Sequence, residues 1–306
     1  MSLITKYRPI QWDEVIGNKP LVKSLVTVLR RRDSHAFLLT GSSGCGKTTI
    51  ARLAAKEVGA REVIEIDAAT NNGVEEMRAL AESTNYQPLI GDARCIIIDE
   101  CQAITTPAWR ALLKSVEEPA PWLYWFFCTT EPGKVPAQIK TRCTSYQVSE
   151  LPSNQIVAEL LRPVCVSERR ETSDRILFLC ADLAEGSPRK SLALLAQVID
   201  CQDYDEAKAI ISQAEIEDSP VIQLARMLVK RAKWSAVCNV LRDLTNENPE
   251  GIRKVLETYL TKTILNTTNE ASAKDLALLL GMLTTPMYGN SIAPIVVVTS
   301  KWILGK

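Results

Sequence analysis

The sequence contains 306 residues, of which 46% are hydrophobic and 24% are charged, as in ordinary globular proteins. A single hydrophobic core rarely grows beyond about 250–300 residues, so this length predicts two or three domains. The 36 basic and 36 acidic residues cancel, which argues against strong nonspecific binding of nucleic acid over the whole surface and restricts any DNA contact to a local patch.

The cysteines, the single histidine and the N-terminus exclude further classes. The nine cysteines are scattered and form no CxxC pair, and His35 is the one histidine, so a zinc site or a thiol redox motif is poorly supported. An odd number of scattered thiols is typical of a reducing cytoplasm. The N-terminus has no apolar stretch typical of a signal peptide, and no run reaches the ~20 apolar residues of a membrane span. We therefore expect a cytoplasmic protein without zinc and without a membrane partner.

Short apolar runs alternate with helical patterns in the first 150 residues. This alternation predicts an α/β domain with a parallel sheet covered on both faces. Thr106 and Pro107 suit the N-cap and the first turn of one helix. The aromatic residues between Trp122 and Phe127 are expected in the core of a central strand. The expected strands are 36–40, 62–67, 95–99, 123–129 and 145–148, and the expected helices include 48–58, 74–81 and 106–118.

Strand signals nearly vanish after residue 150. Residues 154–212 show the pattern of one small helical unit, and residues 219–306 show that of another. Asn248 and Pro249 suit the cap and first turn of a helix, and the apolar run 292–298 is expected in the core. We predict three domains, with residues 1–150, 151–212 and 213–306.

The eight residues from Gly41 to Thr48, GSSGCGKT, match the phosphate-loop pattern GxxxxGK[ST]. They lie between an expected strand and an expected helix, which is the context that the motif requires. Glycines allow backbone N–H groups to turn toward phosphate oxygens, and the helix N-terminus adds partial positive charge. We expect Lys47 to reach the β- and γ-phosphates of a nucleotide and Thr48 to bind Mg²⁺. The nucleotide-binding residues expected here are Gly41, Ser42, Ser43, Gly44, Cys45, Gly46, Lys47, Thr48 and Thr49.

A pair of carboxylates, Asp99 and Glu100, follows the expected strand 95–99. The carboxyl ends of parallel strands meet at one edge of a sheet, so this pair should lie beside the phosphate loop. Asp99 is expected to hold Mg²⁺ through its water shell, and Glu100 to polarise the attacking water. Kinases with a phosphate loop use a hydroxyl acceptor and do not need this glutamate, so the pair favours hydrolysis over a small-molecule kinase.

With these motifs the chain resembles the ATPase subunits of sliding-clamp loaders, within the AAA+ class. The resemblance rests on specific motifs over residues 5–200, and beyond residue 200 it rests only on the arrangement of the expected helices. The motifs at 65–78 and 112–121 are similar to the motor subunit of bacterial loaders in particular. The motifs are KYRPIQWDEVIGN (6–18), EIDAATNNGVEEMR (65–78), LLKSVEEPAP (112–121), CTTEPGKVPAQIKTRC (128–143) and GSPRKSLALLAQ (186–197).

The resemblance assigns roles to residues outside the phosphate loop. It implies that Thr130 is a sensor that contacts the attacking water or the γ-phosphate. It implies that Arg142 completes the ATP site of a neighbouring subunit, and that Arg189 reaches the γ-phosphate from a helical lid. The opening segment should wrap the adenine. Its expected nucleotide-binding residues are Tyr7, Arg8, Pro9, Val15 and Ile16.

Two departures from the resembled family are visible. The four-cysteine zinc module usual in the bacterial motor subunit is missing, because residues 59–61 run directly into the expected second strand. This compactness is similar to the loaders of phages and archaea. In addition, Cys101 and Gln102 follow the carboxylate pair, where the family usually has valine-histidine or alanine-aspartate. We therefore expect the coupling of DNA to this motif to differ in detail.

A local DNA-contacting surface is implied by the same resemblance. It places DNA inside a spiral of subunits, against the helices that follow the second and third strands. Arg78 lies on the first helix and Lys114 on the second. The backbone amides of Asn71, Asn72 and Gly73, near a helix start, are expected to add phosphate contacts. The alternative is that Arg78 and Lys114 are simply solvated helix residues.

The sequence thus predicts an AAA+ α/β phosphate-loop domain, a helical lid and a helical collar that holds a ring together. The expected activity is ATP hydrolysis with Mg²⁺, used to open a sliding clamp and load it onto primer-template DNA. The expected partners are the clamp, the DNA and other loader subunits, in a pentameric ring. One alternative is a branch-migration or helicase-loading ATPase, which would need a further DNA-binding domain. Another is a structural loader subunit, although such subunits usually lose the phosphate loop.

Overall fold

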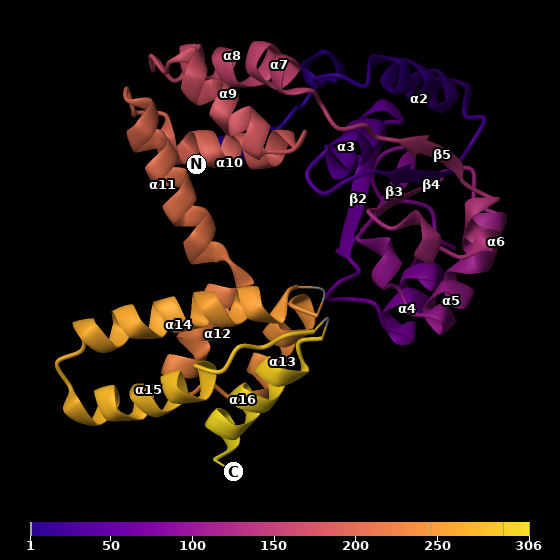
Figure 1. Cartoon of the computed structure of the whole chain (residues 1–306). Coiled ribbons are helices and arrows are strands. Elements are labelled where there is room, and N and C mark those ends of the chain that lie inside the picture. Colours follow the sequence, from indigo (N-terminus) through magenta and orange to yellow (C-terminus); the bar gives the residue numbers. More distant parts are fainter. Residues whose placement is uncertain (1, 246, 290, 306) are drawn as a thin grey trace. The chain divides into compact units, whose positions relative to one another are not determined.

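The computed structural model describes residues 2–245, 247–289 and 291–305. The chain forms two compact units, Met1–Lys208 and Ala209–Lys306 (Figure 1). The first unit contains a sheet and its covering helices, followed by a group of short helices. The separate boundary near residue 150 and the three-domain division stay predictions.

The sheet of the first unit consists of five parallel strands in the order β2-β3-β4-β1-β5. Thr40 at the end of β1 pairs with Thr129 at the end of β4, so the carboxyl ends of these strands meet at one edge. The α/β parallel-sheet fold predicted from the sequence is confirmed. The strands are β1 (Ala36–Thr40), β2 (Ala60–Asp67), β3 (Ala93–Asp99), β4 (Leu123–Thr129) and β5 (Thr144–Gln147).

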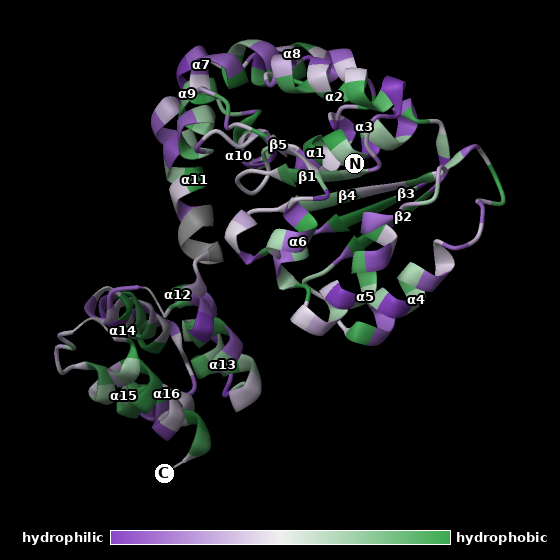
Figure 2. Cartoon of the chain, turned by 90° about the vertical axis from the view of Figure 1, so that its right-hand side faces the viewer, coloured by the Kyte–Doolittle hydropathy of each residue, from purple (hydrophilic) through white to green (hydrophobic). Residues whose placement is uncertain are grey.

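Both faces of the sheet are buried, because helices cover them (Figure 1). Helices α2 (Lys19–Arg31) and α3 (Lys47–Glu57) pack on one face, and α4 (Val74–Ser83) and α5 (Thr106–Glu117) pack on the other. These helices carry both hydrophobic and hydrophilic residues, as expected of helices with one face toward the core and one toward solvent (Figure 2).

The central strands β3 and β4 are hydrophobic along nearly their whole length, as strands buried on both faces must be. Phe37 stacks on Phe126 with 5.0 Å between ring centroids, and Trp125 stacks on Phe127 at 5.7 Å. The prediction that the aromatic run of β4 belongs to the core is therefore confirmed.

The N-cap of helix α5 lies one residue earlier than predicted. Thr105 is the N-cap, and its side chain accepts a hydrogen bond from Ala108 N at 3.4 Å. Thr106 is the first helical residue, so its prediction as the cap was wrong. Thr105 has an extended backbone with ψ of 152°, and because Pro107 has no N–H, the Thr105 side chain accepts from Ala108.

After the sheet, the first unit continues with helices that pack together and against the N-terminal segment. Helix α1 (Leu3–Lys6) packs on α10 (Pro188–Val198). Lys6 Nζ and Tyr7 Oη both donate to Glu168 Oε1 at 2.7 Å, which joins the opening segment to the helices. The other elements are the 3₁₀ helices η1 (Trp12–Glu14), η2 (Cys101–Ala103) and η3 (Pro132–Lys134), the π-helix η4 (Val157–Leu161), and α6 (Ala137–Lys140), α7 (Ser153–Ile156), α8 (Arg162–Ser167) and α9 (Asp174–Leu183).

In its described residues, the second unit contains helices and connecting loops and no strand. Asn248 caps α14 as predicted, because its side chain accepts hydrogen bonds from Glu250 N and Gly251 N. The apolar run 292–298 is only partly core: it begins α16, where Ile295 is buried and Val297 is half exposed. The helices are α11 (Tyr204–Asp218), which spans the boundary between the units, α12 (Pro220–Val229), α13 (Trp234–Asp243), α14 (Pro249–Asn266), α15 (Glu270–Leu283) and α16 (Ala293–Leu304).

A nearly buried arginine ties α14 to the end of α15. Arg253 donates to both oxygens of Glu250 at 2.7 Å, to Glu257 at 2.7 Å and to Leu283 O at 2.8 Å. These hydrogen bonds from Arg253, with a further one from Met287 N, lower the pKa of Glu250 to about 2. The carboxylate of Glu250 is therefore stabilised in its charged form in the folded protein.

We predict that Arg253→Met lowers the melting temperature at pH 7, because Glu250 loses its cationic partner. The folded pKa of Glu250 lies below its ordinary value of 4.5, so its stabilising effect is present above about pH 5 and is lost as the pH falls toward 2. The difference in melting temperature between wild type and variant should therefore shrink between pH 7 and pH 3.5, measured by calorimetry on the whole chain.

The matched control is Arg242→Met, because Arg242 is exposed and, among the described residues, its side chain bonds Asn239 in its own turn. This variant should melt like wild type. An equal deficit of Arg253→Met at both pH values would show that the ionic contact does not account for its stability effect.

Candidate active site

The phosphate loop connects the end of β1 to the start of α3. Gly41, Gly44 and Gly46 have φ values of 149°, 74° and 109°, which side chains rarely adopt. A Cβ on Gly41 would lie 2.3 Å from Val148 O, and one on Gly44 would lie 2.3 Å from Ser187 Oγ. The loop therefore fits closely between the segment after β5 and the start of α10, and only glycine allows this approach.

Lys47 is buried across this loop. Its Nζ donates to Gly41 O at 2.9 Å and to Ser42 O at 2.8 Å. Ser42 Oγ is buried without a hydrogen-bond partner in the described part of the chain, and an unpaired buried hydroxyl costs about 1–3 kcal/mol. An unpaired donor, a buried ammonium group and a helix N-terminus together fit a phosphate group of a nucleotide.

Thr48 and Asp99 join the loop to the end of β3. Thr48 Oγ1 donates to Asp99 Oδ2 at 2.6 Å, and Asp99 Oδ1 accepts from Glu100 N at 3.0 Å. A hydroxyl beside a carboxylate is a donor set that Mg²⁺ accepts, usually with several waters. The two residues predicted to hold Mg²⁺ are thus in direct contact, and their oxygens fit that ion.

Glu100 and Thr130, predicted as the base and the sensor, also lie together. Glu100 has a left-handed φ of 48° and begins the turn η2. Within this turn, Gln102 Nε2 donates to Glu100 Oε2 at 2.5 Å and to Thr130 Oγ1 at 3.1 Å. Thr130 Oγ1 also donates to Glu100 Oε2 at 3.5 Å. The sequence did not predict the role of Gln102 in this contact.

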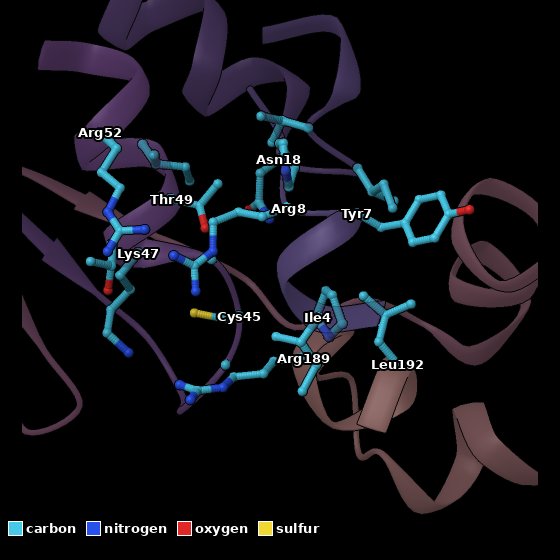
Figure 3. A pocket seen from close by; sticks show the side chains of 18 of the residues that line it. Ile4, Tyr7, Arg8, Asn18, Cys45, Lys47, Thr49, Arg52, Arg189 and Leu192 are labelled. Carbon is cyan, nitrogen blue, oxygen red and sulfur yellow. The ribbon is translucent and has the colours of Figure 1, made fainter. Parts of the chain in front are cut away.

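A cavity of about 290 Å³ lies beside the loop and is lined by the opening segment, the loop with the start of α3, and the start of α10 (Figure 3). Asp99 and Glu100 line it as well, and so do the loop residues from Ser43 to Thr49. Gly41 and Ser42 instead contact Lys47. Arg189 also lines the cavity, as do the predicted residues of the opening segment, Tyr7, Arg8, Pro9, Val15 and Ile16.

Several cations converge in this cavity. The pKa of Arg8 is lowered by burial and then by the positive charges of Arg52 and Arg189. Figure 3 shows the three guanidinium groups directed toward the same part of the cavity as Lys47. Arg52 donates to both oxygens of Glu65, at 2.7 and 2.6 Å, and this hydrogen bonding raises the pKa of Arg52. The site therefore favours a polyanionic ligand.

The sequence did not predict that Arg52 and Glu65 belong to the site. Arg52 lies four residues after Thr48, and residues at this spacing share one face of a helix. That spacing was a usable signal for Arg52. Glu65 gave no such signal, because only the pairing of β2 beside β3 brings it to α3.

Arg142 lies outside the lining of this cavity. It is exposed, follows α6, and forms an ion pair with Glu117 at 3.4 Å between Nε and Oε1. It is therefore not placed to act on a ligand in its own chain's cavity. Its predicted role at a neighbouring subunit stays a prediction.

The predicted DNA-contacting residues lie on and before the adjacent helices α4 and α5. Arg78 is exposed and pairs with Glu75 at 3.0 Å, and Lys114 is exposed in the last turn of α5. The backbone amide of Asn71 donates to Asp67 O at 3.0 Å in a turn, and its contact with a phosphate stays a prediction. The amides of Asn72 and Gly73 and the two cations stay predicted contacts.

Residues 2–245, 247–289 and 291–305 contain no group of three or more His, Cys, Asp or Glu side chains placed to hold a metal ion. Within the same residues, no helix is both long and apolar enough to cross a membrane.

Comparison with known proteins gives the chain clear relatives. A family model described as DNA polymerase III, delta subunit, matches residues 60–152. The gamma/tau subunit of Mycobacterium tuberculosis is 34% identical over 225 residues, which cover 65% of this chain and 39% of the relative. The tau subunit of Escherichia coli is 32% identical over 254 residues, which cover 74% and 39%. The chain thus spans about two fifths of the length of these relatives.

Among solved structures, the branch-migration motor RuvB of Thermotoga maritima is similar in fold. One RuvB variant has a TM-score of 0.58 at 18% identity and covers 89% of this chain and 98% of its own. At this identity the likeness concerns the fold alone. The sequence matches confirm the predicted resemblance to clamp-loader ATPase subunits.

We predict that Arg8→Met weakens ATP binding roughly tenfold, because one charged hydrogen-bond donor to the phosphates is worth about 1.5–3 kcal/mol. Binding of adenosine should change much less, because adenosine has no phosphates. Isothermal titration with both ligands measures the difference.

Arg61→Met is the matched control, because Arg61 is exposed on β2 and does not line the cavity. This variant should bind ATP like wild type. A similar weakening of ATP and adenosine by Arg8→Met would show that Arg8 does not act on the phosphates.

Proposed function

We propose that this chain is an ATP-hydrolysing motor subunit of a sliding-clamp loader that acts during DNA replication in the cytoplasm. The observation that carries the proposal is the contact between a complete phosphate loop and the carboxylate pair, at the 2.6 Å hydrogen bond from Thr48 to Asp99. The similarity to gamma/tau subunits supports clamp loading as the process that ATP hydrolysis would drive.

ATP would bind with its phosphates at the start of α3. Lys47 and the amides of the loop would hold the β- and γ-phosphates. Arg8 and Arg189 would face the phosphates from the opening segment and from α10. Bound Mg²⁺, held by Thr48 and Asp99, supplies neutralisation of the phosphate charge.

Hydrolysis would depend on Glu100 and Thr130 at the carboxyl edge of the sheet. The carboxylate of Glu100 lines the cavity and can accept a proton from, or orient, a water molecule. Thr130 lies within hydrogen-bond distance of the same carboxylate oxygen. Charge builds up on phosphate oxygens in the transition state, and a cation added there can raise the rate by ~10³–10⁵.

We assign that additional cation to Arg142 of a neighbouring subunit, since Arg142 is exposed and outside the cavity of its own chain. Hydrolysis would then require assembly. In this proposal residues 151–212 act as a lid that carries Arg189, and residues 213–306 act as a collar that holds a pentameric ring together.

We propose that the protein loaded is a sliding clamp and that it is loaded onto primer-template DNA. Arg78 and Lys114, with the amides of Asn72 and Gly73, would contact phosphates of DNA without reading its sequence. A loader must act at any primer end, so sequence-independent contacts suit it. The fold similarity to RuvB does not favour branch migration, because it carries no information on substrate at 18% identity.

The proposal predicts that Lys47→Ala abolishes ATP binding, because the buried ammonium group at the phosphates is lost. It predicts that Glu100→Gln binds ATP like wild type and loses at least ~100-fold in turnover, the lower end of general-base effects. Nucleotide titration and a phosphate-release assay on the assembled protein separate the two effects. Equal losses of binding in both variants would sink the assignment of Glu100.

A further prediction concerns Arg142. Arg142→Ala should leave the ATP affinity of the isolated chain unchanged and reduce hydrolysis in the assembled ring by ~10³-fold or more. Rings mixed from Arg142→Ala and Glu100→Gln chains should regain part of the activity, because some interfaces then combine an intact Glu100 with an intact Arg142. No recovery in well-mixed rings would mean that Arg142 does not act across an interface.

A further inference from the structure

Gln102 contacts both residues proposed for hydrolysis and has no part in the function described so far. We infer that Gln102 is a positioning residue that holds the Glu100 carboxylate and the Thr130 hydroxyl in one fixed arrangement for attack by water. This inference rests on the proposed ATP hydrolysis and names a residue that controls it.

The orientation of the Gln102 amide follows from its neighbours. Glu131 N can only donate, and it donates to Thr129 Oγ1 at 3.0 Å. The single hydrogen of the Thr129 hydroxyl is then left for Gln102 Oε1, at 2.7 Å. The oxygen of the amide therefore faces Thr129, and the nitrogen faces Glu100 and Thr130.

Thr129 is a rigid anchor for this amide. Its side chain is fully buried at the end of β4, and its backbone oxygen accepts from Gly41 N at 3.3 Å. Gln102 itself lies in the turn η2, which is closed by hydrogen bonds from Ala103 N to Glu100 O and from Ile104 N to Cys101 O. The end of β4 and this turn thus fix the amide from both sides.

The hydrogen bonds leave one carboxylate oxygen of Glu100 free. In the described chain, Gln102 Nε2 at 2.5 Å and Thr130 Oγ1 at 3.5 Å both bond Oε2 of Glu100. Oε1 has no such partner there, and Glu100 lines the cavity. Fixing one oxygen restricts rotation of the carboxylate, which keeps the other oxygen available to a water molecule. A small displacement of a catalytic group can lower the rate of the reaction substantially.

Gln102→Glu separates this role from a merely structural one. A glutamate keeps the length of the side chain and an oxygen that accepts from Thr129, and it replaces the donor toward Glu100 by a second acceptor. We expect hydrolysis by the assembled protein to fall about 10- to 100-fold, which is part of the ~10²–10⁴ that general-base catalysis contributes. The ATP dissociation constant should stay within about twofold, because the anchor to Thr129 persists.

Two further variants complete the experiment. Gln102→Met has the same length without added charge, and it should also lower the turnover number with little change in ATP affinity. It provides the test if Gln102→Glu does not fold. Gln197→Glu, on the exposed face of α10, is the matched control and should hydrolyse ATP like wild type.

The outcomes distinguish this inference from the proposed function. Wild-type turnover in a Gln102 variant, together with an inactive Glu100→Gln, would overturn the positioning role and leave the hydrolytic site intact. Loss of ATP affinity in parallel with turnover in both Gln102→Glu and Gln102→Met would show that Gln102 is only structural. Wild-type turnover in Glu100→Gln would instead contradict the proposed hydrolysis itself.

Discussion

The hydrogen bond between Thr48 Oγ1 and Asp99 Oδ2 is possible only because parallel strands end at one edge of the sheet. β1 leads into the phosphate loop, β3 ends in Asp99 and is followed by Glu100, and β4, between them, ends in Thr129 and is followed by Thr130. The strand order β3-β4-β1 therefore brings together residues more than fifty positions apart in the chain. The positions of the loop, the carboxylates and the proposed sensor all depend on this order.

The parts of the site that arise within one short segment could be predicted from the sequence. The loop from Gly41 to Thr48 has its pattern and its flanking strand and helix in consecutive residues, and hydrophobic β3 ends visibly in Asp99. Contacts between distant segments could not be predicted in the same way. The pairing of Arg52 with Glu65 depends on strand β2 and helix α3 lying together, and the orientation of the Gln102 amide depends on hydroxyls at the end of β4.

Smaller differences have local physical reasons. The cap of α5 is Thr105, whose backbone is extended (ψ 152°) and whose side chain accepts from Ala108 N, so the helix begins one residue earlier than predicted. The amide of Asn71 closes a turn on Asp67, which the sequence gives no means to foresee. The run 292–298 is uniformly apolar, yet it forms a helix that buries only one face. Composition predicts that such a segment is buried, whereas helical geometry decides which side chains are.

The central claim is that this chain uses ATP to load a sliding clamp. The direct measurement is the transfer of a labelled clamp onto primed circular DNA by a loader reconstituted from this chain and its partner subunits, with clamp-bearing DNA separated from free clamp by gel filtration. The account predicts ATP-dependent transfer with the wild-type chain and none with Lys47→Ala. ATP hydrolysis by the assembled wild-type protein without any transfer of clamp would contradict the account and indicate a different substrate for this ATPase.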